Sequence, residues 1–266
     1  MEHADEARVA AGYDAVYAAI PNSPAFQRIW RAHALGQDYP QGFEHISFLT
    51  LPEMQSMAAA LHLSAGSVLV DLACGMGGPG LWIARETGAQ LIGIDISAVA
   101  LAAARERAQR LSLSQIARFV PGSFARTNLD SGSADGVMSV DALQYAPDKQ
   151  AALDEAARIL RPGGRLAFAC FEFEPARVAG MPVLGTDPVS DYRPALEQAR
   201  FDIVSYAESD HWRERLTDTY QAVVDVAPAL NEEMGAPGSD ALLGELTLTL
   251  QLQPYRRRVL VSATKR

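Results

Sequence analysis

Val68-Leu-Val-Asp-Leu-Ala-Cys-Gly-Met-Gly-Gly-Pro-Gly80 is the stretch from which the architecture of this chain can be worked out. Its first part, Val68 to Leu72, is apolar apart from Asp71, which is typical of a parallel strand buried on both faces. Several glycines follow, and because glycine has no Cβ they predict a turn in which a ligand can approach the main chain closely. Pro79 suits the first position of a helix. The stretch therefore predicts a strand, a glycine-rich turn and a helix, the arrangement of a nucleotide-type site.

The position of Asp71 helps to choose among the interpretations of this turn. A glycine turn can be a tight loop without a ligand, and Gly75, Gly77 and Gly80 also spell the G-x-G-x-x-G of dinucleotide-binding folds. An acid four residues before the first glycine is not part of that dinucleotide pattern. A second acid, Asp95, ends the next apolar run, where a carboxylate can accept hydrogen bonds from a ribose diol. NAD-dependent enzymes use the same device, so Asp95 alone does not separate the two cofactor classes.

Together these features resemble the motifs of the class I S-adenosylmethionine-dependent methyltransferases. Asp71 with its glycines resembles motif I, and Asp95 matches the second acidic position of the family. The stretch from Asp135 to Asp148 resembles motif IV and the loop after it, and Leu160-Arg-Pro-Gly-Gly-Arg165 resembles the turn before the fifth strand. The motifs occur in the family's order, which is more specific than any one of them. The resemblance covers residues 66–171 by motif and the flanks only by layout.

The resemblance implies S-adenosylmethionine as the cofactor. In the family the glycine turn passes under the methionine half, the first acid supports the ammonium group, usually through water, and the second acid binds both ribose hydroxyls. Ser123 stands where the family often has an acid for the adenine amino group, and Phe124 can pack on the adenine ring; a plain turn is the alternative there. The expected cofactor-binding residues are Asp71, Ala73, Gly75, Gly77, Asp95, Ile96, Ser123, Phe124, Asp141, Tyr13 and Tyr17.

Strands and helices alternate after Val68, which predicts a parallel sheet with right-handed crossovers. We expect an α/β fold with a Rossmann-like seven-stranded sheet, parallel except for an antiparallel last strand, with helices on both faces and a helical cap. The predicted strands are 68–72, 91–95, 117–120, 136–141, 165–171, 201–206 and 258–264, and the predicted helices between them include 79–87, 98–111, 148–160 and 192–199. Residues 175–190 are expected to form a loop.

The two flanks are expected to cover the site. Residues 1–65 are interpreted as an N-terminal helical lid, and residues 66–266 as the methyltransferase domain with a helical substrate cap at about 207–253. Residues 240–250 fit both a helix and a strand, and we choose a helix because the resemblance places a helical cover there. The early aromatic residues can simply pack on the sheet or can close over an apolar substrate. In related enzymes a tyrosine of the first helix approaches the methyl donor, and Tyr13 and Tyr17 are the candidates.

The predicted chemistry needs little beyond an aligned nucleophile, about 3 Å from the methyl carbon, in a dry pocket. A base is required only for a poor acceptor such as a phenol, enol or amide. Many relatives have a histidine in the loop after the fourth strand, where this chain has Tyr145, a weak base at neutral pH but a good orienting donor. His45 and His211 are the other candidate bases, and for each the competing interpretation is a surface or packing role. Asp141 and Gln144 are expected to face the reaction centre.

The net charge and the composition of the chain restrict the class of molecule that it can bind. The net charge of −9 argues against nucleic acid, whose phosphates require a basic face. No apolar run approaches the ~18 residues of a membrane helix, and the first residues lack the pattern of a signal peptide, so a cytoplasmic location is expected. Cys74 and Cys170 are interpreted as buried thiols, and no metal site is expected. We expect a small-molecule partner, and a monomer or homodimer.

The sequence therefore predicts an enzyme that transfers a methyl group from S-adenosylmethionine to an O, N or C atom of a mostly apolar small molecule, a secondary metabolite. One alternative is a member that binds the cofactor without transferring methyl, as a scaffold or a cyclase. Another is an NAD(P)-dependent reductase. A nucleic-acid methyltransferase is disfavoured by charge and by the missing Asn/Asp-Pro-Pro-Tyr/Phe motif at the fourth strand.

Overall fold

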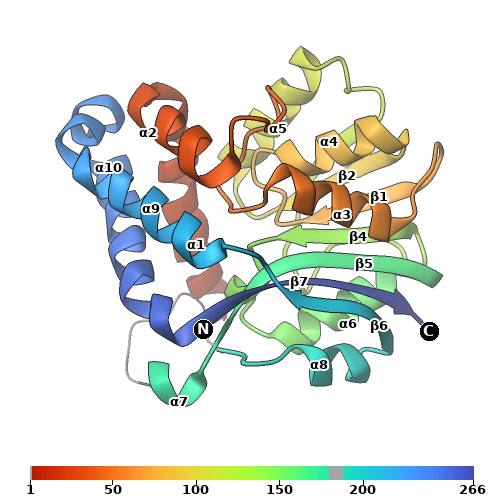
Figure 1. Cartoon of the computed structure of the whole chain (residues 1–266). Coiled ribbons are helices and arrows are strands. Elements are labelled where there is room, and N and C mark those ends of the chain that lie inside the picture. The colour runs from red at the N-terminus through yellow and green to blue at the C-terminus, as the bar shows by residue number, and fades with distance from the viewer. Residues whose placement is uncertain (1, 180–187) are drawn as a thin grey trace.

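A seven-stranded sheet forms the centre of the molecule (Figure 1). The computed structural model describes residues 2–179 and 188–266, in which the strands lie in the order β3-β2-β1-β4-β5-β7-β6. β7 is antiparallel to both of its neighbours and the remaining strands are parallel to one another, which confirms the predicted fold class. The bounds are β1 Val68–Leu72, β2 Gln90–Asp95, β3 Ala117–Pro121, β4 Ala134–Val140, β5 Leu160–Phe173, β6 Phe201–Glu208 and β7 Arg256–Lys265.

Helices cover both faces of this sheet. α3 (Leu51–Leu61), α4 (Gly78–Thr87) and α5 (Ala98–Arg110) pack on one face, and α6 (Lys149–Ile159) and α8 (Arg193–Gln198) pack on the other (Figure 1). α3 falls within residues 1–65 and packs on β5 and β7 of the sheet. In the described part of the chain, no helix has both the length and the apolar character needed to cross a membrane.

The central strand β1 supplies side chains to both apolar layers. Leu69 belongs to the cluster that contains Leu81 of α4 and Leu101 of α5, whereas Val70 belongs to the cluster that contains Leu153 of α6. Leu69 and Val70 are fully buried, and burying a side chain of this kind stabilises the fold by ~1.5–3 kcal/mol. Because successive side chains of a strand point to opposite faces, these two residues fix the register of β1 in the sheet.

A third group of helices lies beyond the carboxyl ends of the parallel strands, at the left of Figure 1. We call it the helical cover. It consists of α1 (Glu2–Ala19), α2 (Pro24–Ile29), the π-helix η2 (Trp30–Leu35), α9 (Trp212–Asp225) and α10 (Ala227–Leu252). The cover therefore joins segments from the two ends of the chain over one edge of the sheet, where ligands bind in open α/β folds.

Two contacts hold α1 and α2 against α10. Gly238 of α10 permits a close approach, because a Cβ there would lie 2.5 Å from the Cβ of Ala19. Glu233 accepts hydrogen bonds from the Ser23 hydroxyl at 2.6 Å and from the Ala25 amide at 3.1 Å. The backbone bends at Gly235, whose φ of 71° interrupts α10. Residues 240–250 are helical, which confirms the choice made for that ambiguous stretch.

The fold differs from expectation mainly at element ends. β5 begins at Leu160 and not at residue 165, because Ala134 pairs with Leu160 before the register shifts to Gly136 opposite Arg165. Residues 175–178 of the predicted loop form a short helix, α7 (Pro175–Val178), and residues 180–187 lie outside the described residues. The remaining short turns are η1 (Ile20–Asn22), η3 (Leu143–Tyr145) and η4 (Gln253–Tyr255).

Candidate active site

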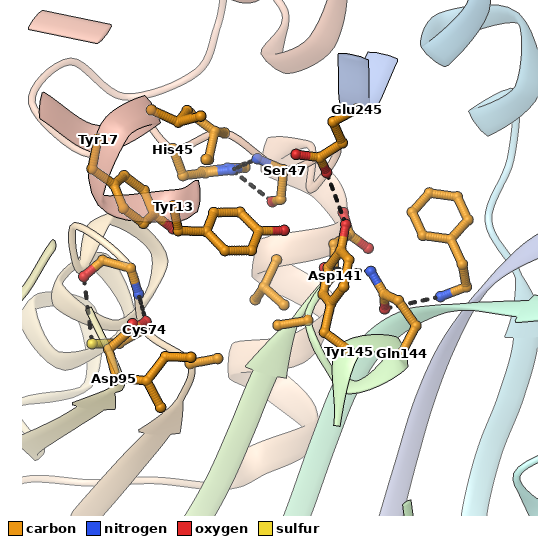
Figure 2. A pocket seen from close by; sticks show the side chains of 18 of the residues that line it. Tyr13, Tyr17, His45, Ser47, Cys74, Asp95, Asp141, Gln144, Tyr145 and Glu245 are labelled. Atoms are coloured by element: carbon orange, nitrogen blue, oxygen red, sulfur yellow. Dashed lines mark hydrogen bonds between the residues drawn. The ribbon is translucent and has the colours of Figure 1, made fainter. Parts of the chain in front are cut away.

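A cavity of about 320 Å³ lies between the helical cover and the carboxyl ends of β1, β2 and β4 (Figure 2). This volume is in the range of small-molecule sites. The structure brings most of the predicted site residues together around it: Tyr13, Tyr17, His45, Asp71, Ala73, Gly75, Asp95, Ile96, Ser123, Phe124, Asp141 and Tyr145 all line its wall. Gly77 and His211 are not among the lining residues.

The glycine turn after β1 depends on close packing as well as on ligand access. Gly77 has a φ of 75° and is the cap that begins α4, so it shapes the turn without lining the cavity. A Cβ on Gly78 would collide with the Phe43 carbonyl oxygen, and one on Gly80 would lie 2.5 Å from Oδ2 of Asp71. The missing side chains therefore let the N-terminal segment and the first acid approach the helix directly.

The two predicted acids have different surroundings. Asp71 is 2% exposed and has no hydrogen bond or ion pair among the described residues. Burial and the nearby carboxylate of Asp95 raise the pKa of Asp71 to about 8. Asp95 accepts the amide hydrogens of Gly75 at 2.8 Å and Ser97 at 2.9 Å; burial raises its pKa, and these bonds oppose the rise. Asp95 is thus held in one orientation, whereas Asp71 lacks a partner.

The turn after β3 forms one end of the part of the cavity that contains Asp71 and Asp95. Ser123 and Arg126 close this turn through reciprocal backbone hydrogen bonds of 3.0 and 3.2 Å. Ser123 and Phe124 line the cavity beside Ile96, which is 38% exposed. A hydroxyl, an aromatic ring and an apolar side chain are therefore available at the position where the resemblance places adenine.

Helix α1 places two tyrosines over the glycine turn. A Cβ on Gly75 would lie 2.7 Å from the Tyr17 hydroxyl, and the rings of Tyr17 and Tyr13 are stacked with centroids 5.9 Å apart. Asp14, between them in the sequence, accepts a hydrogen bond from the Ser97 hydroxyl, which also caps α5. This bond attaches α1 to the end of β2, so the position of the tyrosines is coupled to that of Asp95.

Tyr145 has a carboxylate partner from the opposite side of the cavity. Its hydroxyl donates a hydrogen bond of 3.0 Å to Oε1 of Glu245 on α10 (Figure 2). The ring of Tyr13 meets the ring of Tyr145 edge-on, with centroids 5.8 Å apart. Burial raises the pKa of Tyr145 well above its usual value, and burial also raises the pKa of Glu245. A neutral phenol is thereby held between a carboxylate and the interior of the cavity.

The side chain of Asp141 makes contacts that stabilise the fold. It accepts hydrogen bonds from Arg258 Nε at 2.8 Å and from the Phe48 amide at 2.8 Å, and Arg258 also binds Glu53 at 2.6 Å. Gln144 donates to the Asp141 carbonyl at 2.6 Å. Asp141 lines the cavity and has a backbone φ of 48°, and its carboxylate joins the segment before α3 to β7.

The two histidines differ in position. His45 lines the cavity, but both of its ring nitrogens are engaged. Nε2 contacts the Leu49 carbonyl at 3.2 Å. Nδ1 contacts the Ser47 hydroxyl at 2.7 Å, as Figure 2 shows. Burial lowers the pKa of His45 to about 3, so the ring is neutral. His211 lies outside the cavity, where its side chain is 84% exposed and contacts Glu214. Neither ring is therefore placed as a free base.

The end of the cavity away from Asp95 is mainly aromatic. Phe26 and Trp30 are stacked at 4.9 Å, and Phe48 meets Tyr220 edge-on at 5.3 Å. Further apolar lining residues there are Ile46, Phe171, Phe173, Leu242 and Leu246. Arg256, at the start of β7, also lines this end and is 5% exposed. This half of the cavity therefore suits a largely apolar ligand.

Three residues in or beside the cavity, Asp14, Glu245 and Arg256, were not predicted from the sequence. Glu245 was hidden in the leucine-rich run of residues 241–250, although an isolated acid on the same helical face as Leu242 and Leu246 was a detectable signal. Arg256 was one of three consecutive arginines, and nothing in the sequence distinguishes it from Arg257 and Arg258. Asp14 lay between the two predicted tyrosines without a recognisable partner.

One sequence feature favours the reductase alternative and can be compared with the structure. Tyr145 and Lys149 stand four residues apart, the Tyr-x-x-x-Lys spacing of such enzymes. In the structure Tyr145 lines the cavity and binds Glu245, whereas Lys149 begins α6, is 3% exposed and is not a lining residue. The spacing does not bring both groups to one site.

The donors and acceptors of the cavity fit S-adenosylmethionine. Asp71 is a buried acid that has no cation beside it among the described residues and could receive an ammonium group, and Asp95 is a fixed acceptor for hydroxyl donors. On the side where Gly75 lacks a Cβ, the nearest atoms belong to the Tyr17 ring and hydroxyl. A phosphate-rich dinucleotide would instead place its negative charge beside two acidic side chains.

Comparison with known proteins agrees with this geometry. The family model described as "Methyltransferase domain" matches residues 70–168. Methyltransferase GfsG of Streptomyces halstedii is 30% identical over 197 residues, 70% of this chain and 66% of GfsG. The 27-O-demethylrifamycin SV methyltransferase of Amycolatopsis mediterranei is 27% identical over 71% of each chain. The chain thus spans about two thirds of the length of GfsG, and the next two curated relatives are matched over 33% and 28% of theirs.

Among solved structures, the [4+2]-cyclase SpnF has a similar fold. The two chains superpose with a TM-score of 0.76 at 20% identity, over 98% of this chain and 96% of SpnF. The match extends through the helical cover as well as the sheet, since it spans almost all of both chains. At this level of identity it supports the fold alone.

Proposed function

This chain belongs to the class I S-adenosylmethionine-dependent methyltransferases, and we propose that it transfers the methyl group to a nucleophilic O, N or C atom of a mostly apolar small molecule, a secondary metabolite. The observation that carries the proposal is the continuity of the cavity. One wall of the cavity joins the acids Asp71 and Asp95 to the aromatic half around Trp30 and Tyr220, with Tyr145 between them.

We propose the following roles for the residues that hold the cofactor. Asp71 faces its ammonium group, Asp95 accepts from the ribose hydroxyls, and Ser123 and Phe124 contact the adenine. The main chain at Ala73 and Gly75 and the side chain of Ile96 complete the contact surface, and Tyr13 and Tyr17 cover it. When bound, S-adenosylmethionine supplies an electrophilic methyl group that already carries its leaving group.

Tyr145 and Glu245 form the proposed proton path for a poor acceptor. Tyr145 donates its hydroxyl hydrogen to Glu245, and its phenol oxygen can accept a hydrogen bond from the methyl acceptor. When the acceptor is a hydroxyl group, methylation of its oxygen releases the hydroxyl proton. This proton passes to the Tyr145 oxygen while the Tyr145 hydroxyl proton passes to Glu245. The phenol remains neutral before and after the step, as its raised pKa requires. His45 and His211 have no place in this path.

The helical cover supplies the dry environment. We propose that α1, α2 and η2 of the N-terminal lid and α9 and α10 of the cap close over the acceptor and exclude water. The two-part division into residues 1–65 and 66–266 is retained as a proposal, with α3 assigned to the sheet. A cytoplasmic location is likewise proposed, and the free buried thiols of Cys74 and Cys170 are consistent with a reducing compartment.

Methyl transfer can be tested by measuring S-adenosylhomocysteine. The full chain would be incubated with S-adenosylmethionine and a panel of apolar phenols, enols and hydroxylated polyketides, beside the Glu245→Gln variant. We expect at least one acceptor to give equal amounts of S-adenosylhomocysteine and methylated product, more slowly with the variant. The cyclase alternative would be supported by a bound acceptor that is converted to a product of unchanged mass while the cofactor remains intact.

A further inference from the structure

Arg256 presents a buried positive charge to the aromatic half of the cavity. The residue is 5% exposed, and its guanidinium carbon lies 4.4 Å from the centroid of the Phe171 ring. Its Nε and Nη2 atoms are buried and have no hydrogen-bond partner, and the side chain has no ion pair among the described residues. Burying a charge is costly unless it is paired and hydrogen-bonded, so this arginine requires an anion that the described residues do not provide.

The neighbouring carboxylates are already engaged. Asp141 binds Arg258 and the Phe48 amide, and Glu245 accepts the Tyr145 hydroxyl. Both influence Arg256 electrostatically, but neither lies within ion-pair distance of it. In addition, Trp30 Nε1 is a buried donor without a hydrogen-bond partner, and Trp30 lines the same half of the cavity. Two residues that line the aromatic half, one on η2 and one on β7, therefore carry buried N–H donors without a hydrogen-bond partner among the described residues.

The unpaired edge restricts the class of anion. Nε and Nη2 form one side of the planar guanidinium fork, which matches the two oxygens of a carboxylate. Arg256 is the only arginine among the described lining residues, which include no lysine, and His45 is neutral. A phosphate or diphosphate would need more positive charge than one guanidinium beside Glu245 and Asp141 supplies.

We infer that Arg256 is an anchoring site for a carboxylate of the methyl acceptor, so that the substrate is an apolar molecule bearing one carboxylate. This inference rests on the proposed function, because it takes the aromatic half of the cavity as the acceptor site. The carboxylate is held and is not itself the methylated group. Arg256 fixes the end of the acceptor that lies away from Asp95, and the acceptor atom then falls beside Tyr145.

The test compares decanoate with decan-1-ol, which has the same chain length and no charge. Calorimetric titrations would be made with the full protein, with and without S-adenosylhomocysteine, using the wild type, Arg256→Met and Arg256→Lys. Arg177→Met is the matched control, since it removes a positive charge from an exposed side chain outside the cavity. We expect the wild type and Arg177→Met to bind decanoate at least tenfold more tightly than decan-1-ol. Arg256→Met should lose this preference, and Arg256→Lys should keep part of it.

Several results would overturn the inference. They are the absence of a decanoate preference in the wild type, its persistence in Arg256→Met, or tighter binding of decylphosphonate than of decanoate. Failure to bind S-adenosylhomocysteine would instead overturn the proposed function. The preference for decanoate is measured separately, in the titrations made without S-adenosylhomocysteine. Because Arg256 is unpaired, Arg256→Met should unfold at the same or a higher temperature than the wild type. A large loss of stability would assign the guanidinium to the fold and contradict the inference.

Discussion

At the scale of single residues, Asp71 and Asp95 are expected to respond differently to substitution. Asp95 is fixed by the Gly75 and Ser97 amides and can offer its remaining lone pairs to two hydroxyls. Asp71 has no such bonds and shares the buried space with Asp95. Loss of Asp95 should therefore remove specific hydrogen bonds, whereas neutralising Asp71 should change how binding and stability depend on pH.

Asp95→Ala is expected to weaken S-adenosylhomocysteine binding at least tenfold. Each lost hydrogen bond to a charged acceptor contributes ~1.5–3 kcal/mol, and ~1.4 kcal/mol is one factor of ten. The measurement is a calorimetric titration, with circular dichroism to show that the variant is folded and Asp154→Ala as an exposed control. An unchanged dissociation constant in folded Asp95→Ala would remove this residue from the site.

Asp71→Asn is expected to make the free protein more stable at pH 8.5. The folded pKa of Asp71 is raised to about 8 from a usual 3.8, so between these values the folded chain holds a proton that the unfolded chain has released. Stability from this group is therefore present below the lower value and is lost as the pH rises through the upper one. Thermal unfolding of wild type and variant should agree at pH 4 and diverge at pH 8.5.

The same variant should weaken cofactor binding. An ammonium group favours the ionised Asp71, so the affinity of the wild type for S-adenosylhomocysteine should rise from pH 5.5 to 7.5, and that of Asp71→Asn should not. Titrations at both values check this. A parallel pH dependence in the two proteins would show that Asp71 does not face the ammonium group.

Tyr145 and Glu245 should behave as one unit in turnover. Tyr145→Phe is expected to lower the rate about 10- to 100-fold, the scale of one lost hydrogen bond of ~1–3 kcal/mol. Glu245→Gln should have a similar effect, because it removes the proton acceptor beyond the tyrosine. The double variant should be little slower than either single one. Additive losses would show that the two residues act separately, and unchanged S-adenosylhomocysteine affinity controls for binding.

At the scale of elements, the contact between α1 and α10 should control closure of the cover. Gly238 and Gly244 lie on the same helix, but only a Cβ at 238 would meet α1, at 2.5 Å from Ala19, whereas one at 244 meets nothing within 4 Å. Gly244→Ala should stabilise the protein, since alanine is favoured over glycine in a helix by up to ~1 kcal/mol. Gly238→Ala should instead lower the melting temperature, accelerate hydrogen exchange in α1 and slow turnover. Equal behaviour of the two variants would show that α1 does not need this close contact.

The sheet elements could be predicted from sequence far better than the cover. β1 and the helix after it follow from an apolar run, glycines and Pro79, all of which act locally, and the structure confirms them within one residue. The role of Asp141 could not be predicted in this way, because its partners Arg258 and Phe48 come from distant parts of the chain. Glu245 and Arg256 depend on how α10 and β7 approach the loop after β4. Such long-range placement leaves no periodic signal in a single sequence.

At the scale of the whole molecule, Arg258 of β7 joins the C-terminal strand to α3 and to the loop after β4. It is fully buried and binds Asp141, Glu53 of α3 and the Ser209 hydroxyl at 2.8 Å. Burial opposes ionisation of Glu53, but the Arg258 charge prevails and lowers the pKa of that carboxyl. The stability that Glu53 contributes is therefore present above its usual pKa and is lost as the pH falls through its lowered value.

Arg258→Met should lower the free energy of unfolding by ~3–5 kcal/mol, because it leaves Asp141 without its cation and leaves Glu53 with Arg215 alone, at 3.7 Å. Urea titration at pH 7 measures this loss, and the difference from the wild type should narrow below pH 4 as Glu53 becomes protonated. Arg266→Met, which breaks an exposed pair with Asp202, is the control and should change stability by at most ~1 kcal/mol. A loss below that of the control would show that the contacts of Arg258 with α3 and Asp141 do not stabilise the fold.

The identity of the cofactor is the claim on which every other proposal depends. A calorimetric titration of the full wild-type chain with S-adenosylhomocysteine, beside NADH under the same conditions, tests it most directly. One site per chain for S-adenosylhomocysteine is expected, weakened in Asp95→Ala, with no heat of binding for NADH. Saturable binding of NADH together with no response to S-adenosylhomocysteine would contradict the methyltransferase assignment.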